Sequence, residues 1–68
     1  MTIHFDTKAD AVYVQFRAGQ SVRTEETKDG FAVDYNRTGK VIGVEVLSVS
    51  KRFPDGFKIP DRILKLAQ

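Results

Sequence analysis

Residues 29–47, which read DGFAVDYNRTGKVIGVEVL, carry the strongest fold signal in the chain. Asp29-Gly30 is typical of a tight hairpin turn, because these residue types tolerate the positive φ angles that such a turn requires. Asn36 to Gly39 forms a second turn signal, with Asn at its first position and Gly where a left-handed residue follows. Residues 31–36 and about 41–49 have the composition of extended strands. The stretch therefore predicts two consecutive antiparallel hairpins.

The segment before residue 29 continues this pattern. Residues 3–5 form a short extended run, residues 11–17 alternate between apolar and polar side chains, and residues 21–28 read as a polar strand. Alternation with period two places the two classes of side chain on opposite faces of a sheet. Ala18-Gly19 predicts a turn. We therefore expect an antiparallel β-meander of four to five strands, in which each strand is joined to the next by a hairpin.

The pattern changes after Ser50. Residues 53–56, Phe-Pro-Asp-Gly, predict a turn that ends the sheet. Pro60 suits the first turn of a helix, and apolar side chains follow at helical spacing over about 60–67. A helix this short is unstable alone in water, so we expect it to pack on the sheet. The predicted fold is α+β in a single domain, 1–68, with the sheet over about 2–49.

The length and composition exclude several kinds of stabilising site. A chain of 68 residues holds one small core and buries roughly 60% of its unfolded surface. The absence of cysteine excludes disulfides and thiolate metal sites, and a single histidine excludes a histidine-rich metal site. We therefore expect no cofactor and no bound metal. The N-terminus has no basic region followed by an apolar run, and no stretch approaches the ~20 apolar residues of a membrane span, so a cytoplasmic protein is expected.

The predicted strand 41–47, VIGVEVL, suggests an oligomer. Val41 and Leu47 are expected on one side of it, and Ile42, Val44 and Val46 on the other, so that both faces are largely apolar. One short helix covers only one face. We therefore predict that a second copy of the chain covers the other face or an edge, with a homodimer as the first expectation.

Acidic residues in the predicted strands raise the question of catalysis. If the Asp29-Gly30 turn has a two-residue loop, Glu25 lies directly across from Asp34, and two such carboxylates suit acid–base chemistry. Ion pairing with Arg17 or Arg23 is the structural alternative, and a shift of register by one residue removes the pairing altogether. An enzyme would need Asp34, Glu45 and His4 to converge in one pocket.

Other polar residues have simpler interpretations. Asp6, Asp10 and Asp29 lie in turns, where carboxylates either hold a hard cation or bond to nearby backbone N–H groups, and the turn role is favoured. His4 alternates with apolar neighbours on the first strand and is expected to face outward at a sheet edge. A lone histidine without a nucleophile or carboxylate companion is weak evidence for catalysis.

The charge is asymmetric along the chain. Residues 1–50 hold six basic and seven acidic side chains, for −1, whereas residues 51–68 hold five basic and two acidic ones, for +3. Basic residues interleaved with aromatic ones can contact phosphates and stack on bases. Two other interpretations stay open: a solvated helix face, and phenylalanines that close over a small core or a dimer seam. The residues that would contact a partner or a nucleic acid are Lys51, Arg52, Phe53, Phe57 and Lys58.

Several runs of the sequence together resemble a known bacterial family. The runs are, in order, DTKADAVYV (6–14), TEE (24–26), DYN (34–36), GKVIGVEVL (39–47) and SKR (50–52). They resemble the small bacterial proteins catalogued as domain of unknown function 2283, over roughly residues 3–52. The resemblance does not extend to the turn at 53–57 and the helix.

The resemblance implies no assigned activity. Small families of this kind often accompany toxin-like proteins in bacteria, so the resemblance implies an antitoxin-like partner role by analogy only. It singles out Tyr13, Asp34, Gly43 and Glu45 as a functional or structural cluster. Glycine within a strand indicates a bulge or a close approach, and Tyr13 is a candidate to cover that gap. We expect a non-enzymatic, homodimeric protein-interaction module, with a nucleic-acid-binding or antitoxin-type regulator as the alternative.

Overall fold

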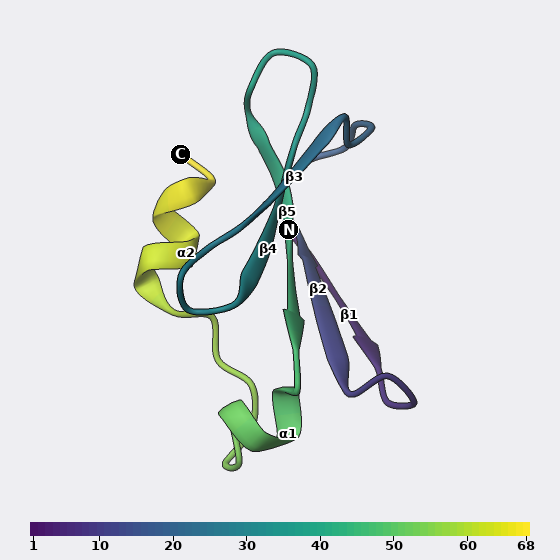
Figure 1. Ribbon diagram of the computed structural model, residues 1–68, viewed down its shortest axis with the longest axis vertical. Helices are drawn as coiled ribbons and strands as arrows, with labels where there is room; N and C mark the ends of the chain where they lie inside the picture. The colour runs from purple at the N-terminus through teal and green to yellow at the C-terminus, as the bar shows by residue number, and fades with distance from the viewer.

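The computed structural model describes residues 1–68 as a five-stranded antiparallel sheet with two short helices (Figure 1). The strands alternate between inward and outward side chains, and the helices follow the last strand. This arrangement is mostly β with a small helical part, which is consistent with the predicted α+β class. The elements are β1 (Thr2–Asp6), β2 (Ala11–Gln15), β3 (Arg23–Glu26), β4 (Phe31–Tyr35), β5 (Val41–Leu47), α1 (Val49–Arg52) and α2 (Asp61–Leu66).

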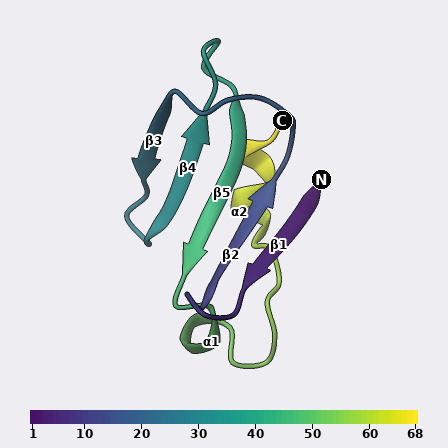
Figure 2. The same ribbon diagram turned by 90° about the vertical axis from the view of Figure 1, so that its right-hand side faces the viewer.

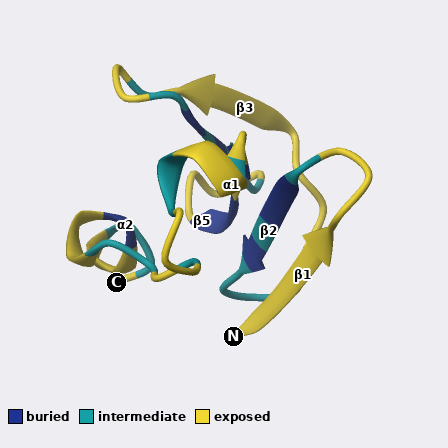
Figure 3. Cartoon of the chain, turned by 90° about the horizontal axis from the view of Figure 1, so that it is seen from below, coloured by how far each residue is buried: buried dark blue, intermediate teal, exposed yellow.

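The order of strands in the sheet is β1-β2-β5-β4-β3, so the predicted meander is wrong (Figure 2). A meander would place β3 beside β2, whereas β5 lies between β2 and β4. Three of the four expected hairpin links exist, namely β1–β2, β3–β4 and β4–β5. The physical reason is burial: β5 is the most apolar strand and takes the central position, whereas the polar strand β3 lies at an edge (Figure 3).

The link from β2 to β3, residues 16–22, is a crossover and not the expected turn at Ala18-Gly19. Its first part runs beside β5, since the backbone N–H of Phe16 donates to the carbonyl oxygen of Ile42 at 2.8 Å. Its last part reaches β4, where the N–H of Val22 donates to the carbonyl oxygen of Tyr35 at 3.0 Å. The crossover thus carries the chain past β5 to the far edge of the sheet.

A β-bulge in β5 explains why both Val41 and Ile42 are buried. Asp34 pairs with Gly43, but Tyr35 pairs with Val41, so that Ile42 is the extra residue. Val41 joins the same core cluster as Val44 and Val46, contrary to the predicted alternation. Ile42 lies beside Gly19 of the crossover, where an added Cβ would be 3.5 Å from its Cγ2 atom.

The other face of β5 therefore carries Gly43, Glu45 and Leu47, and it is not largely apolar. Both faces of β5 would be largely apolar only with regular alternation from Val41 to Leu47, and the bulge breaks that alternation. The apolar residues at the start of β5 are buried within one chain. A dimer needs other support.

The hairpin between β3 and β4 has a three-residue loop. The N–H of Thr27 donates to the carbonyl oxygen of Phe31 at 2.8 Å. Gly30, with φ 86°, is the left-handed residue that follows a type I turn in such loops. The loop is therefore one residue longer than the two-residue loop on which pairing of Glu25 with Asp34 depends. Thr24 pairs with Asp34, and Glu25 pairs with Val33 on the opposite face, so Glu25 and Asp34 are not partners.

The turn at Asn36–Gly39 is confirmed. The N–H of Gly39 donates to the carbonyl oxygen of Asn36 at 3.0 Å, and Gly39 has φ 85°. The side-chain oxygen of Asn36 also accepts the N–H groups of Thr38 (3.0 Å) and Lys40 (2.9 Å). The side chain of Asn36 therefore stabilises the loop by hydrogen bonds to its backbone.

The core lies on one face of the sheet, the side on which α2 is found (Figure 1). Ile63 of α2 is buried in the core, and Leu66 packs at its margin. Neither helix covers the other face, and Figure 2 views the sheet from that side. The buried core cluster consists of Val12, Phe31, Val33, Val41, Val44, Val46 and Ile63.

Helix α1 departs from the sequence prediction, which extends the last strand to about residue 49. Ser48 adopts a left-handed conformation that ends β5, and Asp10, across the sheet end, supplies the acceptors for the new helix. The Asp10 carboxylate accepts the N–H of Ser50 at 3.0 Å and its hydroxyl at 2.7 Å. The predicted turn at residues 53–56 follows, with the N–H of Gly56 donating to the carbonyl oxygen of Phe53 at 3.0 Å.

Candidate functional site

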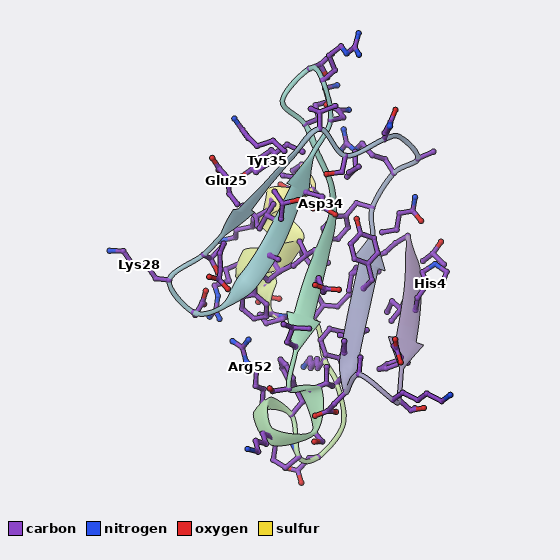
Figure 4. All side chains as sticks on the ribbon, turned by 45° about the vertical axis from the view of Figure 1, so that its right-hand side comes forward. His4, Glu25, Lys28, Asp34, Tyr35 and Arg52 are labelled. Atoms are coloured by element: carbon purple, nitrogen blue, oxygen red, sulfur yellow. The ribbon has the colours of Figure 1, made fainter.

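The face of the sheet that no helix covers, here called the open face, collects most of the polar side chains of the five strands. Its members follow from the register: His4 lies opposite Tyr13, Tyr13 opposite Glu45, and Gly43 opposite Asp34. Figure 4 shows His4 at one edge and Asp34 toward the other. The strand positions on this face are Thr2, His4, Asp6, Ala11, Tyr13, Gln15, Thr24, Glu26, Ala32, Asp34, Gly43, Glu45 and Leu47.

The predicted cluster of Tyr13, Asp34, Gly43 and Glu45 lies together at the centre of the open face. The Tyr13 hydroxyl donates to Oδ2 of Asp34 at 2.9 Å, across the intervening strand β5. Thr24 donates its hydroxyl to Oδ1 of the same carboxylate at 2.5 Å. Asp34 is thus held by two neutral donors, and not by the arginines considered from the sequence. Arg17 donates to the carbonyl oxygen of Ala67 at 2.7 Å.

Gly43 makes the tyrosine–aspartate bond sterically feasible. Its missing side chain leaves the space that the Tyr13 ring occupies, because an added Cβ would lie 2.1 Å from the Tyr13 hydroxyl oxygen. Gly43 is buried although it lies on the open face, since the ring covers it. This is the close approach that glycine within a strand indicates.

The electrostatics of the cluster favour a neutral tyrosine. Burial, then the hydrogen bond to Asp34, then the negative charges of Asp34 and Glu45 raise the pKa of Tyr13 to about 12. Each cause penalises a phenolate beside a carboxylate. A tyrosine that resists ionisation is a poor general base or nucleophile near neutral pH, so its role here is that of a hydrogen-bond donor.

We expect this raised pKa to be measurable by ultraviolet titration. In a Tyr35→Phe background, Tyr13 is the remaining tyrosine, and its ionisation midpoint should lie near 12, above the ordinary 10.0. Adding Asp34→Asn should lower the midpoint, because it removes the carboxylate acceptor and its charge. A midpoint that stays unchanged in the Asp34→Asn variant would contradict the bonded geometry.

The same shift predicts a dependence of stability on pH. Because the folded-state pKa is raised, the unfolded chain loses the proton first as pH increases. The stability contributed by the neutral ring is fully present below pH 10.0 and is lost as pH rises to about 12. Denaturant unfolding of the wild type and Tyr13→Phe across this range should show a smaller loss in the variant.

His4, Glu45 and Asp34 do not line one common pocket. His4 and Glu45 line a shallow hollow of about 250 Å³ on the open face, but Asp34 is not part of its lining. Both oxygens of Asp34 are occupied by Tyr13 and Thr24. No group of three or more His, Cys, Asp or Glu side chains is placed to hold a metal ion.

Asp6 and Asp29 accept hydrogen bonds within their own turns, whereas Asp10 accepts those of Ser50. Asp6 accepts the N–H groups of Lys8 and Ala9, both at 3.1 Å, as a turn aspartate does. Asp29 accepts the hydroxyl of Thr27 at 2.6 Å. That bond, with the charges of Arg62 and Arg52, holds the pKa of Asp29 below its usual value.

A comparison with protein families gives one match. The model of the family described as "Protein of unknown function (DUF2283)" matches residues 2–50, which is most of the chain. The chain belongs to this family. No curated protein and no solved structure matches it. The part that matches the DUF2283 model contains all five strands and therefore the whole open face.

Residues 51–68, here called the basic tail, lie outside the DUF2283 match. The aromatic residues of this tail pack within the chain. Phe53 and Phe57 form an edge-to-face pair with centroids 5.0 Å apart, and both pack against the core. Phe57 also meets Phe5 of β1 at 6.1 Å. Of the five residues predicted to contact a partner, only Lys51 and Lys58 are exposed.

Arg52 is already engaged within the chain. Its guanidinium donates to the carbonyl oxygens of Asp29 and Gly30 and lies 4.5 Å from the centroid of the Phe31 ring. Arg62 lies over the same ring at 5.3 Å and forms an ion pair with Asp29. Sequence reasoning missed this pair of arginines, since nothing in the local pattern links residues 52 and 62 to the turn at 29–30.

Proposed function

We propose that this protein is a non-enzymatic protein-interaction module that acts as a homodimer, and that β1 is the strand through which two copies pair. The observation that carries the proposal is the exposure of β1. All five of its residues are exposed, although Ile3 and Phe5 lie opposite the buried residues Val14 and Val12. An edge strand with free backbone groups and apolar side chains is a template for pairing.

The other edge of the sheet is protected by contrast. β3 reads RTEE, and its three charged side chains oppose pairing with another strand. β1 has no lysine, proline or bulge that would block pairing. Ile3 and Phe5 in this strand are 40% and 62% exposed. The two edges therefore differ in the features that block association.

The sequence of β1 is self-complementary in an antiparallel pair centred on His4. Ile3 would then face Phe5 of the second copy, and the same contact would recur on the other side of the two-fold axis. Both contacts lie on the core face, beside the Phe57 ring that already meets Phe5. Such a dimer would extend each hydrophobic core across the seam.

The test is the mass of the protein in solution. We expect light scattering at micromolar concentration to give twice the 7.7 kDa of one chain. Ile3→Lys should weaken association by roughly tenfold or more, because the apolar seam would have to bury an ammonium group. Val22→Lys introduces the same charge at an exposed valine next to the opposite edge and should leave the mass unchanged. A monomeric wild type, or equal effects of both variants, would refute the β1 dimer.

The alternative, a nucleic-acid-binding or antitoxin-type regulator using the basic tail, has less support. Phe53 and Phe57 are engaged in packing, and base stacking needs free aromatic faces. The absence of cysteine suits a reducing bacterial cytoplasm, which is where we place the interaction. No helix of the chain has the length and apolar character needed to cross a membrane.

A further inference from the structure

The open face has an unusual distribution of charge. Four of the nine acidic residues occupy strand positions on it, whereas none of the 11 Lys and Arg residues does. The chain as a whole has a net charge of +2, so the face has the opposite sign to the molecule. The four residues, here called the acidic set, are Asp6, Glu26, Asp34 and Glu45.

The charges of the acidic set are not neutralised within the chain. The two ion pairs of the structure join Arg23 to Glu25 and Arg62 to Asp29, and neither involves the open face. Asp34 receives only the neutral hydroxyl groups of Tyr13 and Thr24. The set therefore places four carboxylates without an ion-pair partner on the uncovered side of the sheet.

A hollow in this face has room for a long basic side chain. It has a volume of about 250 Å³ and lies between β1, β2 and β5. Asp6 and Glu45 provide carboxylates in its lining, while Ala11, Leu47 and the Tyr13 ring provide apolar surface. Lysine and arginine bind in such places by laying the apolar stem on hydrocarbon and the charged head on an acid.

We propose that the open face docks a lysine- and arginine-rich segment of a partner protein, with one basic side chain in the hollow beside Glu45. The inference rests on the proposed role as an interaction module and names the chemistry of its partner. Two copies paired through β1 would be related by a two-fold axis perpendicular to the sheet. Their open faces would lie on the same side and form one longer acidic surface.

The occupant is a protein segment, since the acidic set is spread over four strands and is interrupted by Leu47, Ala11 and Ala32. An extended basic chain matches that alternation of charged and apolar surface. A compact cation does not, because no three potential ligands lie together. Polyamines share the charge but lack apolar side chains to place on Leu47.

The probe for the test is a fluorescein-labelled peptide of alternating lysine, arginine and leucine, measured by fluorescence anisotropy at low salt. The double variant Glu26→Gln, Glu45→Gln should bind it roughly tenfold more weakly, since it neutralises half of the acidic set. The matched control is Glu25→Gln, Asp55→Asn. It changes the net charge equally, but Glu25 points to the core face and Asp55 lies in the turn at 53–56.

We expect less than about a twofold change in the control, because screening weakens the effect of distant exposed charges. Equally weakened peptide binding in both double variants would overturn the proposal. Displacement of the peptide by an equal concentration of spermidine would also overturn it. Light scattering on the same samples separates this inference from the dimer. A monomer whose peptide binding depends on Glu26 and Glu45 would support the docking proposal and refute the β1 dimer. A dimer that does not bind the peptide would refute the docking proposal and leave the dimer standing.

Discussion

Phe31→Ala should remove a large share of the protein's free energy of unfolding. The ring of Phe31 is 1% exposed and is among the largest fully buried side chains of the core. Removing a buried phenylalanine side chain typically costs about 3–5 kcal/mol, because apolar burial is lost and a cavity remains. A domain of this length has on the order of 3–10 kcal/mol of total stability. The substitution therefore removes a large share of it.

The position of Phe31 adds to this cost. Arg52 and Arg62 lie over the ring, and both also contact Asp29, through its carbonyl oxygen or its carboxylate. The ring thus connects the β3–β4 turn with α1 and α2. Without it, both arginines lose the surface against which they lie.

Urea unfolding followed by circular dichroism would measure the effect of Phe31→Ala. Phe31→Leu is the matched control, since it keeps most of the apolar volume and should cost less than half as much. A loss of less than about 1 kcal/mol for Phe31→Ala would mean that the ring is not a core residue. The comparison is best made at one protein concentration, because a dimer makes stability depend on concentration.

The local structure of this chain followed from its sequence to a large extent. The predicted strand 31–36 is one residue longer than β4, and the turn at Asn36–Gly39 has the predicted left-handed glycine. Both features depend on neighbouring residues only. Alternation and turn chemistry are local properties, so a single sequence is sufficient to find them.

The order of the strands could not be predicted from the sequence, because it depends on competition between distant segments. The polar segment at 21–28 pairs with β4 in either topology, and no local signal distinguishes a turn at Ala18-Gly19 from a crossover. The burial of β5 between two strands is a global outcome. The apolar character of residues 41–47 was the available signal for a central strand, and it was interpreted as evidence for a dimer.

Unusual residues in the strands predict part of the candidate site. The parts that depend on strand register could not be predicted from the sequence. Gly43 within an apolar strand predicted a close approach, and Tyr13 does cover it. Glu25 shares a face with Asp34 only if the loop has two residues, and the observed three-residue loop places it on the opposite face, because a one-residue difference in loop length inverts every side chain of β3. The acidic set was missed for the same reason, since its four members share a face only in the observed register.

Gly43→Ala should lower the free energy of unfolding by about 1–2 kcal/mol, although alanine is ordinarily accepted in a strand. The added Cβ would lie 2.1 Å from the Tyr13 hydroxyl oxygen and 2.4 Å from the adjacent ring carbon. No contact this short is tolerated, so the ring must move away from β5. Its hydrogen bond to Asp34 would then break, which leaves the carboxylate with one donor, Thr24.

A double-mutant cycle distinguishes this mechanism from a general effect on the strand. Tyr13→Ala removes the clashing ring, so Gly43→Ala should cost much less in that background, with a coupling free energy of about 1 kcal/mol. Gly39→Ala is the contrasting control: an added Cβ there meets nothing within 4 Å, but its φ of 85° is strained for alanine in any background. Its cost should therefore be independent of Tyr13.

The ionisation of Tyr13 provides a second measurement on the same variant. In Gly43→Ala the displaced ring is more exposed and no longer bonded to Asp34, so its pKa should fall from about 12 toward 10.0. Loss of stability with an unchanged pKa would place the strain in the backbone of β5. A lowered pKa together with the coupling free energy would show that the absence of a side chain at Gly43 is what holds tyrosine and aspartate together across the sheet.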